Sequence, residues 1–401
     1  MRLGGSLLII GSACALTACE TLTYYWQAVQ GQWEIIDKSR PIEEVLAKED
    51  LPDDLRHKLR KVQEIRSYAQ RCLDLPVGEA YADYADLRRD AVVWNVVAAP
   101  EFSLVSTTWC FPVAGCVAYK GFFQRAMADA EAARLANQGH DVSVMAVTAY
   151  STLGWFDDPV LSTFVGLDDE RLTELLLHEL AHRQFYLPGD TVLNESWATA
   201  VARVGTQQMV RETSPAALSP PTCASMTATE GAPVFVTEYK PAAVSGAVES
   251  SVAEAKAAPG SAPPSPSQAE ALLYQEVART LGELETLYAE KSHTPGEIPV
   301  EEWRRRKAEI LRRLPEHYAT KTEGNPAAAP YLRWLQAPLN NARLLAVRNY
   351  QRWVPALTHQ LLVELGGDWQ AFYAWSDALA AMDAEDRHRL LSDLDLRANP
   401  E

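Results

Sequence analysis

The pentapeptide His178-Glu179-Leu180-Ala181-His182 has the residue types and the spacing of a metal site. Side chains four residues apart point to one side of an α-helix, so both imidazoles could bind one Zn2+ at about 2.0–2.1 Å. Glu179 would lie beside the ion without binding it, where its carboxylate could take a proton from a water molecule. The pattern arises by chance in roughly one chain of this length per hundred. The metal-site interpretation of the pentapeptide therefore needs support from the residues around it.

The residues around the pentapeptide predict a buried helix over 168–184 with no internal glycine or proline. Leucines recur through it, at Leu172, Leu175, Leu176, Leu177 and Leu180. Two imidazoles and a glutamate would be costly to bury on such a helix without a partner. Core histidines satisfied by hydrogen bonds are the alternative, and a metal site is the prediction.

A catalytic zinc ion needs a third protein ligand and an open fourth position. Glu195 follows His182 by thirteen residues. Pro188-Gly189 should end the first helix, and Asp190 or Thr191 could cap a second one running to about residue 211. Two antiparallel helices would bring Glu195 to the histidines. The sequence thus predicts one Zn2+ per chain, held by His178, His182 and Glu195.

The segments HELAH and Asn194-Glu195-Ser196-Trp197-Ala198 (NESWA) together resemble the gluzincins, in which HExxH is followed by a helix with the pattern NExxA or NExxS. The resemblance implies zinc-dependent hydrolysis of peptide bonds. The ion would polarise the scissile carbonyl and lower the pKa of water from about 15.7 towards about 7, and Glu179 would be the base.

The sequence also departs from the gluzincin pattern. The gap between the motifs is shorter than in thermolysin-like enzymes. Thr199 stands where those enzymes carry an aspartate that orients one histidine, so we expect another group to hold that imidazole. A GAMEN-type exopeptidase segment is missing, and recognition of a free amino terminus is unexplained.

Several other residues are candidates for substrate contacts. A donor should stabilise the oxyanion, and Tyr150 and Tyr350 are the candidates, with core or surface packing as the alternative. Residues 113–120 could be the sheet edge that binds substrate, or part of a simple hairpin. Asn340, Asn341 and Arg343 could reach the cleft, or else cap and bridge helices.

The first residues resemble a bacterial lipoprotein signal. An apolar run, Leu3 to Ala18, follows Arg2 and ends in Leu16-Thr17-Ala18-Cys19. This implies a signal peptide over residues 1–18, diacylation of Cys19 and a membrane anchor. Residue 20 is Glu rather than Asp, which favours the periplasmic face of the outer membrane. An uncleaved anchor or a plain secretory signal remains the alternative.

Four cysteines remain after such processing. Cys110 and Cys116 flank a Pro/Gly turn and are predicted to form a disulfide, as expected in an oxidising compartment. Cys72 and Cys223 cannot be assigned from the sequence.

The pattern along the chain predicts an α+β fold that is mostly helical. Helices are expected over 21–84 and 124–138, and strands over 91–98, 113–123 and 142–150. We expect a zincin-like catalytic domain whose first part is residues 19–213, with a small sheet before the metal helix. A Pro/Ala/Ser-rich insertion over 214–268 should separate it from a helical part, 269–401.

The acidic composition, with a net charge of -16 and a pI near 5.0, argues against nucleic acid as a partner. A wider resemblance runs through WCFPVAGCVAYKG, AYSTLGWFDDP, HELAH, NESWA and LNNARL to a family of bacterial lipoproteins named as aminopeptidases. It implies a peptide or unfolded protein as substrate. A zinc endopeptidase, a non-catalytic binding lipoprotein and a hydrolase of another bond are the competing hypotheses.

Overall fold

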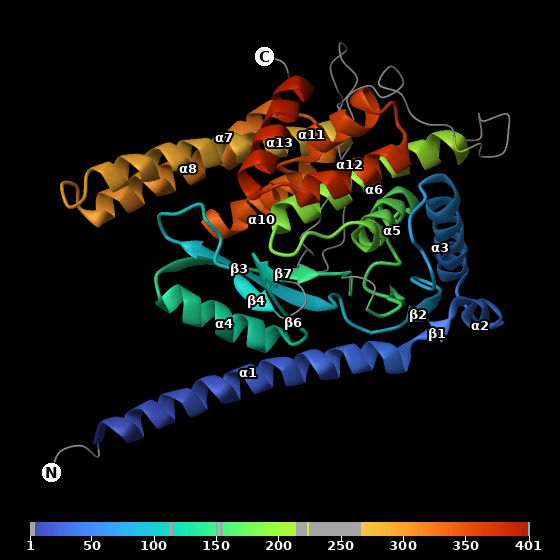
Figure 1. Ribbon diagram of the computed structural model, residues 1–401, viewed down its shortest axis with the longest axis horizontal. Helices are drawn as coiled ribbons and strands as arrows, with labels where there is room; N and C mark the ends of the chain where they lie inside the picture. The colour runs from blue at the N-terminus through green and yellow to red at the C-terminus, as the bar shows by residue number, and fades with distance from the viewer. Residues whose placement is uncertain are drawn as a thin grey trace.

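Helices account for most of the computed structural model, which describes residues 5–111, 115–149, 151–152, 155–213, 223 and 266–399 (Figure 1). Within α1, side chains are described from residue 22 onward. The predicted mostly helical α+β class is confirmed. Among these residues, no helix combines the length and apolar composition needed to cross a bilayer.

The elements follow one another in a clear order along the chain. The helices are α1 (Gly5–Lys38), α2 (Ile42–Leu46), α3 (Asp53–Cys72), α4 (Arg125–Asn137), α5 (Asp169–Gln184), α6 (Thr191–Thr213), α7 (Pro266–His293), α8 (Val300–Lys321), η1 (Pro326–Ala328), α9 (Ala329–Leu335), α10 (Asn341–Gln351), α11 (Val354–His359), η2 (Gln360–Glu364), α12 (Trp369–Ala381) and α13 (Ala384–Ala398). The strands are β1 (Arg40–Pro41), β2 (Asp83–Ala85), β3 (Val93–Pro100), β4 (Trp109–Phe111), β5 (Gly115–Val117), β6 (Lys120–Phe122), β7 (His140–Val147) and β8 (Val160–Leu161).

A three-stranded antiparallel sheet in the order β6-β3-β7 lies between two layers of helices. Because side chains alternate along a strand, Val96 and Ala98 of β3 pack with α4, whereas Val97 packs with α10. Figure 1 shows α1 and α4 on one side of this sheet and α5, α6 and α10 on the other. The helices of the HExxH and NESWA motifs therefore lie on the α10 side.

Two predicted elements are wrong in extent. The helical stretch predicted over 21–84 is divided among α1, α2 and α3, with breaks at 39–41 and 47–52, and it ends at Cys72, after which the chain is irregular up to β2. The strand predicted over 113–123 is broken into β5, which pairs with β4, and β6, which pairs with β3. The break lies at 118–119, between the two strands, while Gly115 begins β5 with a positive φ of 72°, close to the backbone of Gly189. Of the stretch 113–120, which could have been a sheet edge or part of a hairpin, β5 forms a hairpin with β4 and residue 120 begins the edge strand β6, while 112–114 lie outside the described residues.

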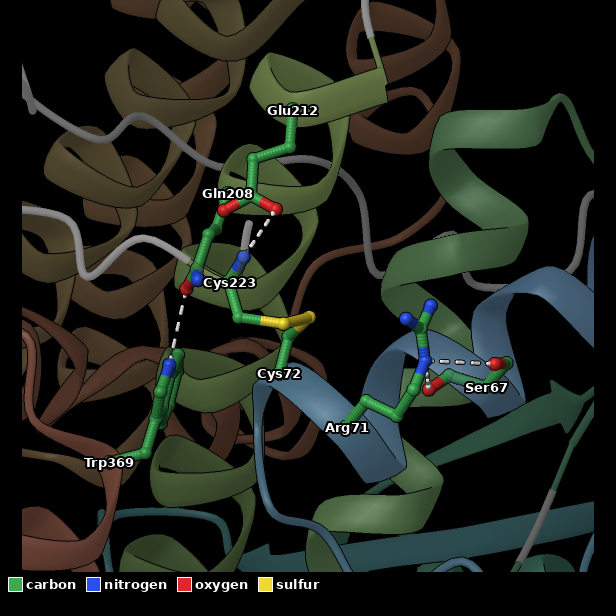
Figure 2. Close-up of a disulfide and its surroundings, with 7 residues drawn as sticks. All are labelled: Ser67, Arg71, Cys72, Gln208, Glu212, Cys223 and Trp369. Atoms are coloured by element: carbon green, nitrogen blue, oxygen red, sulfur yellow. Dashed lines mark hydrogen bonds between the residues drawn. A yellow bond between two sulfur atoms is a disulfide. The ribbon is translucent and has the colours of Figure 1, made fainter. Parts of the chain in front are cut away.

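Two disulfides join distant and neighbouring parts of the chain. Cys110 and Cys116 join β4 to β5, the pair expected from the sequence. Cys72, at the end of α3, is bonded to Cys223 across a separation of 151 residues (Figure 2). The backbone N–H of Cys223 donates to Glu212 Oε2 of α6 at 3.2 Å. The second disulfide thus fixes residue 223 beside α3 and α6. Most of the predicted 214–268 insertion lies outside the described residues.

Candidate metal centre

Helix α5 carries both histidines of the pentapeptide. Asp168 begins it by accepting a hydrogen bond from Arg171 N at 2.9 Å, which satisfies one of the free N–H groups of the first turn. The leucines predicted to be buried form its packing face, so the opposite side is free to carry polar groups. The rings of His178 and His182 lie edge to face, with their centroids 4.9 Å apart. One turn of helix therefore supplies two adjacent imidazoles.

Asn194 closes the short connection from α5 to α6. Its Oδ1 accepts from Leu187 N at 2.7 Å, and its Nδ2 donates to Leu187 O at 2.8 Å. Asp190, one of the two predicted capping residues, accepts from Leu193 N at 3.0 Å. These bonds fold α6 back along α5. The short gap between the two motifs is therefore long enough to bring Glu195 to the histidines.

The next residues of NESWA each have a separate structural role. Ser196 Oγ donates to Asn349 O at 3.4 Å and accepts from Trp353 N at 3.2 Å, which holds α6 against α10 and α11. Trp197 is fully buried, and its Nε1 donates to Ser376 Oγ at 2.8 Å. The motif therefore packs α6 against its neighbours in addition to carrying a candidate metal ligand.

Glu195 points at both histidines. Its Oε2 lies 3.3 Å from His178 Nε2 and 3.6 Å from His182 Nε2. Ligands bound at about 2.0–2.1 Å in a tetrahedron stand about 3.3–3.4 Å apart, so these separations fit one Zn2+-sized ion. Within the described part of the chain, these three residues form a group whose ligand atoms all lie within 4.8 Å of one another. The structure thus brings together the three predicted ligands.

The charge of Glu195 suits a cation. Burial raises the pKa of this carboxyl, but hydrogen bonds and charge from His178 and His182 outweigh burial and hold the pKa at about 2. Burial lowers the pKa of His178, which favours the neutral imidazole. An ionised carboxylate and a neutral imidazole are the forms that bind metal ions.

Glu179 lies on the same helix but is not one of the three clustered ligands. Burial raises the pKa of its carboxyl to about 7, with Glu195 and Asp158 adding repulsion and His182 opposing it. Asp158 is 5% exposed and accepts from Thr152 N at 2.8 Å, which fixes the loop before β8 near Glu179. The site therefore holds a second carboxyl group, distinct from the ligand.

Thr199 itself lies against His178, and the expectation that another group must hold this imidazole is wrong. Its Oγ1 lies 3.4 Å from His178 Nδ1, the ring nitrogen that faces away from Glu195. The Thr199 hydroxyl, one turn after Glu195, thus stands in the position of the longer aspartate side chain. It reaches His178 because α6 packs closely on α5. His182 Nδ1 is buried and has no hydrogen-bond partner among the described residues.

Replacing Thr199 with valine is expected to weaken zinc binding about tenfold, since partners that orient a ligand histidine typically contribute 10–100-fold. Thr206→Val on the same helix is the matched control, because Thr206 is 3% exposed and its Oγ1 has no hydrogen-bond partner in the described part of the chain. Titration with a competing zinc chelator would measure both affinities. Equal affinities for the two variants would contradict the role of Thr199.

A buried polar link joins the three helices around the site. Arg203 of α6 is 3% exposed; its Nε lies 3.5 Å from Glu174 Oε1 of α5, and its guanidinium donates to Gln351 Oε1 of α10 at 2.9 Å. Burial raises the pKa of Glu174 to about 8, against the effect of Arg203. No sequence motif predicts this link. A single arginine within the apolar run of α6 was the available signal.

Tyr350 of α10, one of the two predicted oxyanion donors, stacks on His178, with ring centroids 5.9 Å apart and planes inclined by 28°. Tyr150, the other, lies outside the described residues. Tyr186, just after α5, is not among the residues predicted from the sequence. Burial raises the pKa of its phenol, and the charge of Glu195 raises it further. Tyr186 and Tyr350 are thus the described tyrosines close to the ligands.

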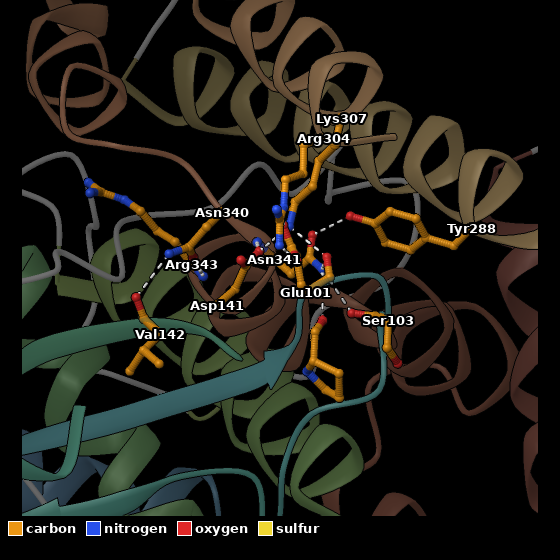
Figure 3. A network of polar contacts seen from close by, with 11 residues as sticks. Glu101, Ser103, Asp141, Val142, Tyr288, Arg304, Lys307, Asn340, Asn341 and Arg343 are labelled. Atoms are coloured by element: carbon orange, nitrogen blue, oxygen red, sulfur yellow. Dashed lines mark hydrogen bonds and ion pairs between the residues drawn. The ribbon is translucent and has the colours of Figure 1, made fainter. Parts of the chain in front are cut away.

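The polar cluster at the start of α10 bridges helices and strands, as one of its two predicted roles required (Figure 3). Asn340 caps α10 by accepting from Arg343 N at 3.0 Å. Asn341 Nδ2 donates to three carbonyl oxygens between residues 100 and 103, and its Oδ1 accepts from Tyr288 at 2.7 Å. These bonds set the position of α10, and hence of Tyr350.

A cavity of about 720 Å³ lies between α7 and the helices α10, α11 and α13. Arg203 and Gln351 line it, whereas the three clustered ligands do not. Its other lining residues are mostly apolar, including Leu281, Val347 and Leu362. The cavity therefore borders the buried polar link and is separate from the metal centre.

The arrangement of two histidines, a clustered glutamate and a second carboxyl group is that of a candidate hydrolase centre. The model of the family described as "Putative aminopeptidase" matches residues 23–240 and 242–391. The chain belongs to this family, whose name indicates a peptidase with a peptide as substrate. No curated protein and no solved structure matches the chain.

Proposed function

We propose that this chain is a zinc peptidase of the gluzincin type, with a zincin-like catalytic domain. The observation that carries the proposal is the approach of Glu195 Oε2 to within 3.3 and 3.6 Å of the two Nε2 atoms. Two imidazoles and a carboxylate are a donor set that suits Zn2+. Membership of a family named for aminopeptidase activity supports the peptidase assignment.

The residues of the site divide into separate tasks in this proposal. His178, His182 and Glu195 would hold the ion, which when bound supplies a Lewis acid that polarises a peptide carbonyl and acidifies water. Glu179 accepts the proton of the attacking water and delivers it to the leaving amine. Tyr350 donates a hydrogen bond to the carbonyl oxygen as negative charge develops there. Thr199 holds the His178 ring in place.

A free amino terminus on the substrate is the expected requirement, since the family is named for aminopeptidase activity. Matched peptide libraries with free and N-acetylated termini would test it by mass spectrometry. We expect release of the first residue from free peptides and at least tenfold slower cleavage after acetylation, a loss of about 1.4 kcal/mol of transition-state binding. Equal cleavage of both libraries at internal bonds would instead identify a zinc endopeptidase.

A non-catalytic binding protein on the same scaffold is the second candidate. Its prediction differs, because such a protein would bind zinc and cleave nothing in either library. The presence of Glu179 beside the clustered ligands argues against it, since binding alone does not require a base.

We further propose that acyl chains on Cys19 anchor the protein at the periplasmic face of the outer membrane of a bacterial envelope. The support is the sequence Leu16-Thr17-Ala18-Cys19 followed by Glu20. Cys19 lies in α1, and its side chain is outside the described residues. Two acyl chains would suffice for stable attachment.

A further inference from the structure

The outer face of α1 carries a row of exposed apolar side chains, here called the α1 stripe. The fractional exposure of its members runs from 42% to 69%, and they are Leu22, Tyr25, Trp26, Val29, Trp33 and Ile36. Two of them are tryptophans, which soluble proteins seldom leave open to water. A contiguous exposed apolar surface of this kind marks an interaction site.

The stripe is narrow and continuous. At about 100° per residue, its six members fall within an arc of about 100° on the helix. Polar residues flank the arc, with Gln30 and Glu34 on one side and Gln32 on the other. Glu34 pairs with Lys38 at 2.8 Å and with Arg89 at 3.1 Å, so its charge is balanced. The helix therefore has a defined apolar face with polar borders.

The opposite face of α1 is already used. Tyr24 stacks on Phe111 with centroids 5.9 Å apart, Gln27 accepts from Phe123 N at 2.8 Å, and Ile35 is 1% exposed. Gly31 lies so close to the Phe123 ring that a Cβ there would clash. Because this face holds α1 to the body, the stripe points away from it. Figure 1 shows α1 along the outside of the molecule with the other elements on one side of it.

We propose that the α1 stripe lies in the surface of a lipid bilayer. Tryptophan and tyrosine favour the boundary between headgroups and acyl chains, and an amphipathic helix lies there with its apolar face immersed. Cys19 precedes Leu22 by three residues, about 4.5 Å along a helix, so an acylated Cys19 would start the stripe at the bilayer. The choice of a bilayer as the partner of the stripe rests on the acyl anchor at Cys19 given under the proposed function. The exposure of the stripe is independent of that anchor.

A second copy of the chain fits this surface less well. A two-stranded coiled coil needs apolar residues at both the a and d positions of each heptad. With Leu22, Val29 and Ile36 at a, the d positions are Tyr25 and Gln32, and the glutamine interrupts the seam. Both tryptophans then lie beside the seam rather than in it.

This placement fixes how the molecule stands on the membrane. In Figure 1, α5 and α6 lie on the opposite side of the sheet from α1. With the α1 stripe immersed, the metal centre lies on the far side of that sheet from the bilayer. Substrates would then come from the aqueous compartment rather than from the lipid phase.

Depth-dependent quenching of tryptophan fluorescence would test the proposal. The full chain, purified from membranes, is reconstituted into vesicles of phosphatidylcholine brominated near either the headgroup end or the tip of the acyl chains. We expect stronger quenching by the headgroup-end bromines, since such a helix sits about 5–10 Å into the boundary region. The double variant Trp26→Phe/Trp33→Phe should lose this quenching. Trp155→Phe, which removes a tryptophan 69% exposed outside α1, should keep it.

Each outcome decides a different point. Absence of quenching in the unaltered chain, or equal quenching in the double variant, overturns the bilayer proposal. Concentration-dependent dimers that the double variant abolishes would assign the stripe to a second copy instead. Mass spectrometry of residue 19 tests the anchor separately: a chain without acyl groups whose α1 tryptophans are still quenched supports the stripe and removes the anchor. Circular dichroism confirms that the variants fold.

Discussion

Replacing Glu179 with glutamine is expected to abolish measurable peptide cleavage while leaving one zinc ion bound per chain. The amide keeps the size and burial of the side chain but cannot take the proton of the attacking water. General acid–base catalysis typically contributes 10²–10⁴-fold, so kcat should fall by at least about 100-fold. The metal should stay, because Glu179 is not among the three clustered ligands. Zinc content by elemental analysis and kcat on the best free-amine peptide measure the two effects.

Glu170→Gln is the matched control for this change. It makes the same substitution in the first turn of the same helix, where the side chain is exposed. Its activity and zinc content should equal those of the unaltered chain. If Glu179→Gln retained full activity, the carboxylate could not be the base, and the reaction would need another proton acceptor. If the Glu179→Gln variant lost the zinc ion, Glu179 would have to be counted among the metal ligands.

The site was predictable because its parts are local in sequence. The pentapeptide fixes two imidazoles on one helix face, and Pro188-Gly189 with Asp190 predicts the reversal that brings Glu195 back. Spacing and turn chemistry determine both features. The mostly helical class was predictable for the same reason, since amphipathic spacing over a dozen or more residues is a strong signal.

What the sequence did not predict depends on contacts between distant segments. Thr199 was dismissed as an orienting residue because its reach depends on how closely α6 packs on α5. The Arg203 link needs Glu174 and Gln351, which lie 29 residues before it and 148 residues after it in the chain. The disulfide from Cys72 to Cys223 spans 151 residues, and no spacing rule selects such a pair.

The broken strand has a different cause. Residues 113–123 are rich in β-branched and aromatic residues, which is typical of a strand. Propensity does not show where a strand turns, and the run is interrupted at 118–119, where the chain passes from the sheet of β4 to that of β3.

Replacing Glu195 with glutamine is expected to remove the metal and, with it, the stabilisation that zinc provides. A ligand that binds only the folded state stabilises it by about 2.7 kcal/mol at a concentration of 100 times its Kd. The unaltered chain should therefore melt several degrees higher with zinc than after chelation. The neutral amide is a much weaker ligand, so this zinc-dependent shift should vanish in Glu195→Gln. Thermal unfolding with and without zinc, together with metal content, is the measurement.

Ser196→Ala separates loss of metal from loss of structure. Ser196 is fully buried and joins α6 to α10 and α11, so its removal should cost about 1 kcal/mol of stability. Because its hydroxyl does not touch the ligands, zinc content and the zinc-dependent shift in melting temperature should persist. A Glu195→Gln variant that still gained the full shift would show that the two histidines bind the ion with some other third ligand. The pairing of HELAH with NESWA would then describe how α5 packs on α6, and not how the chain holds its metal.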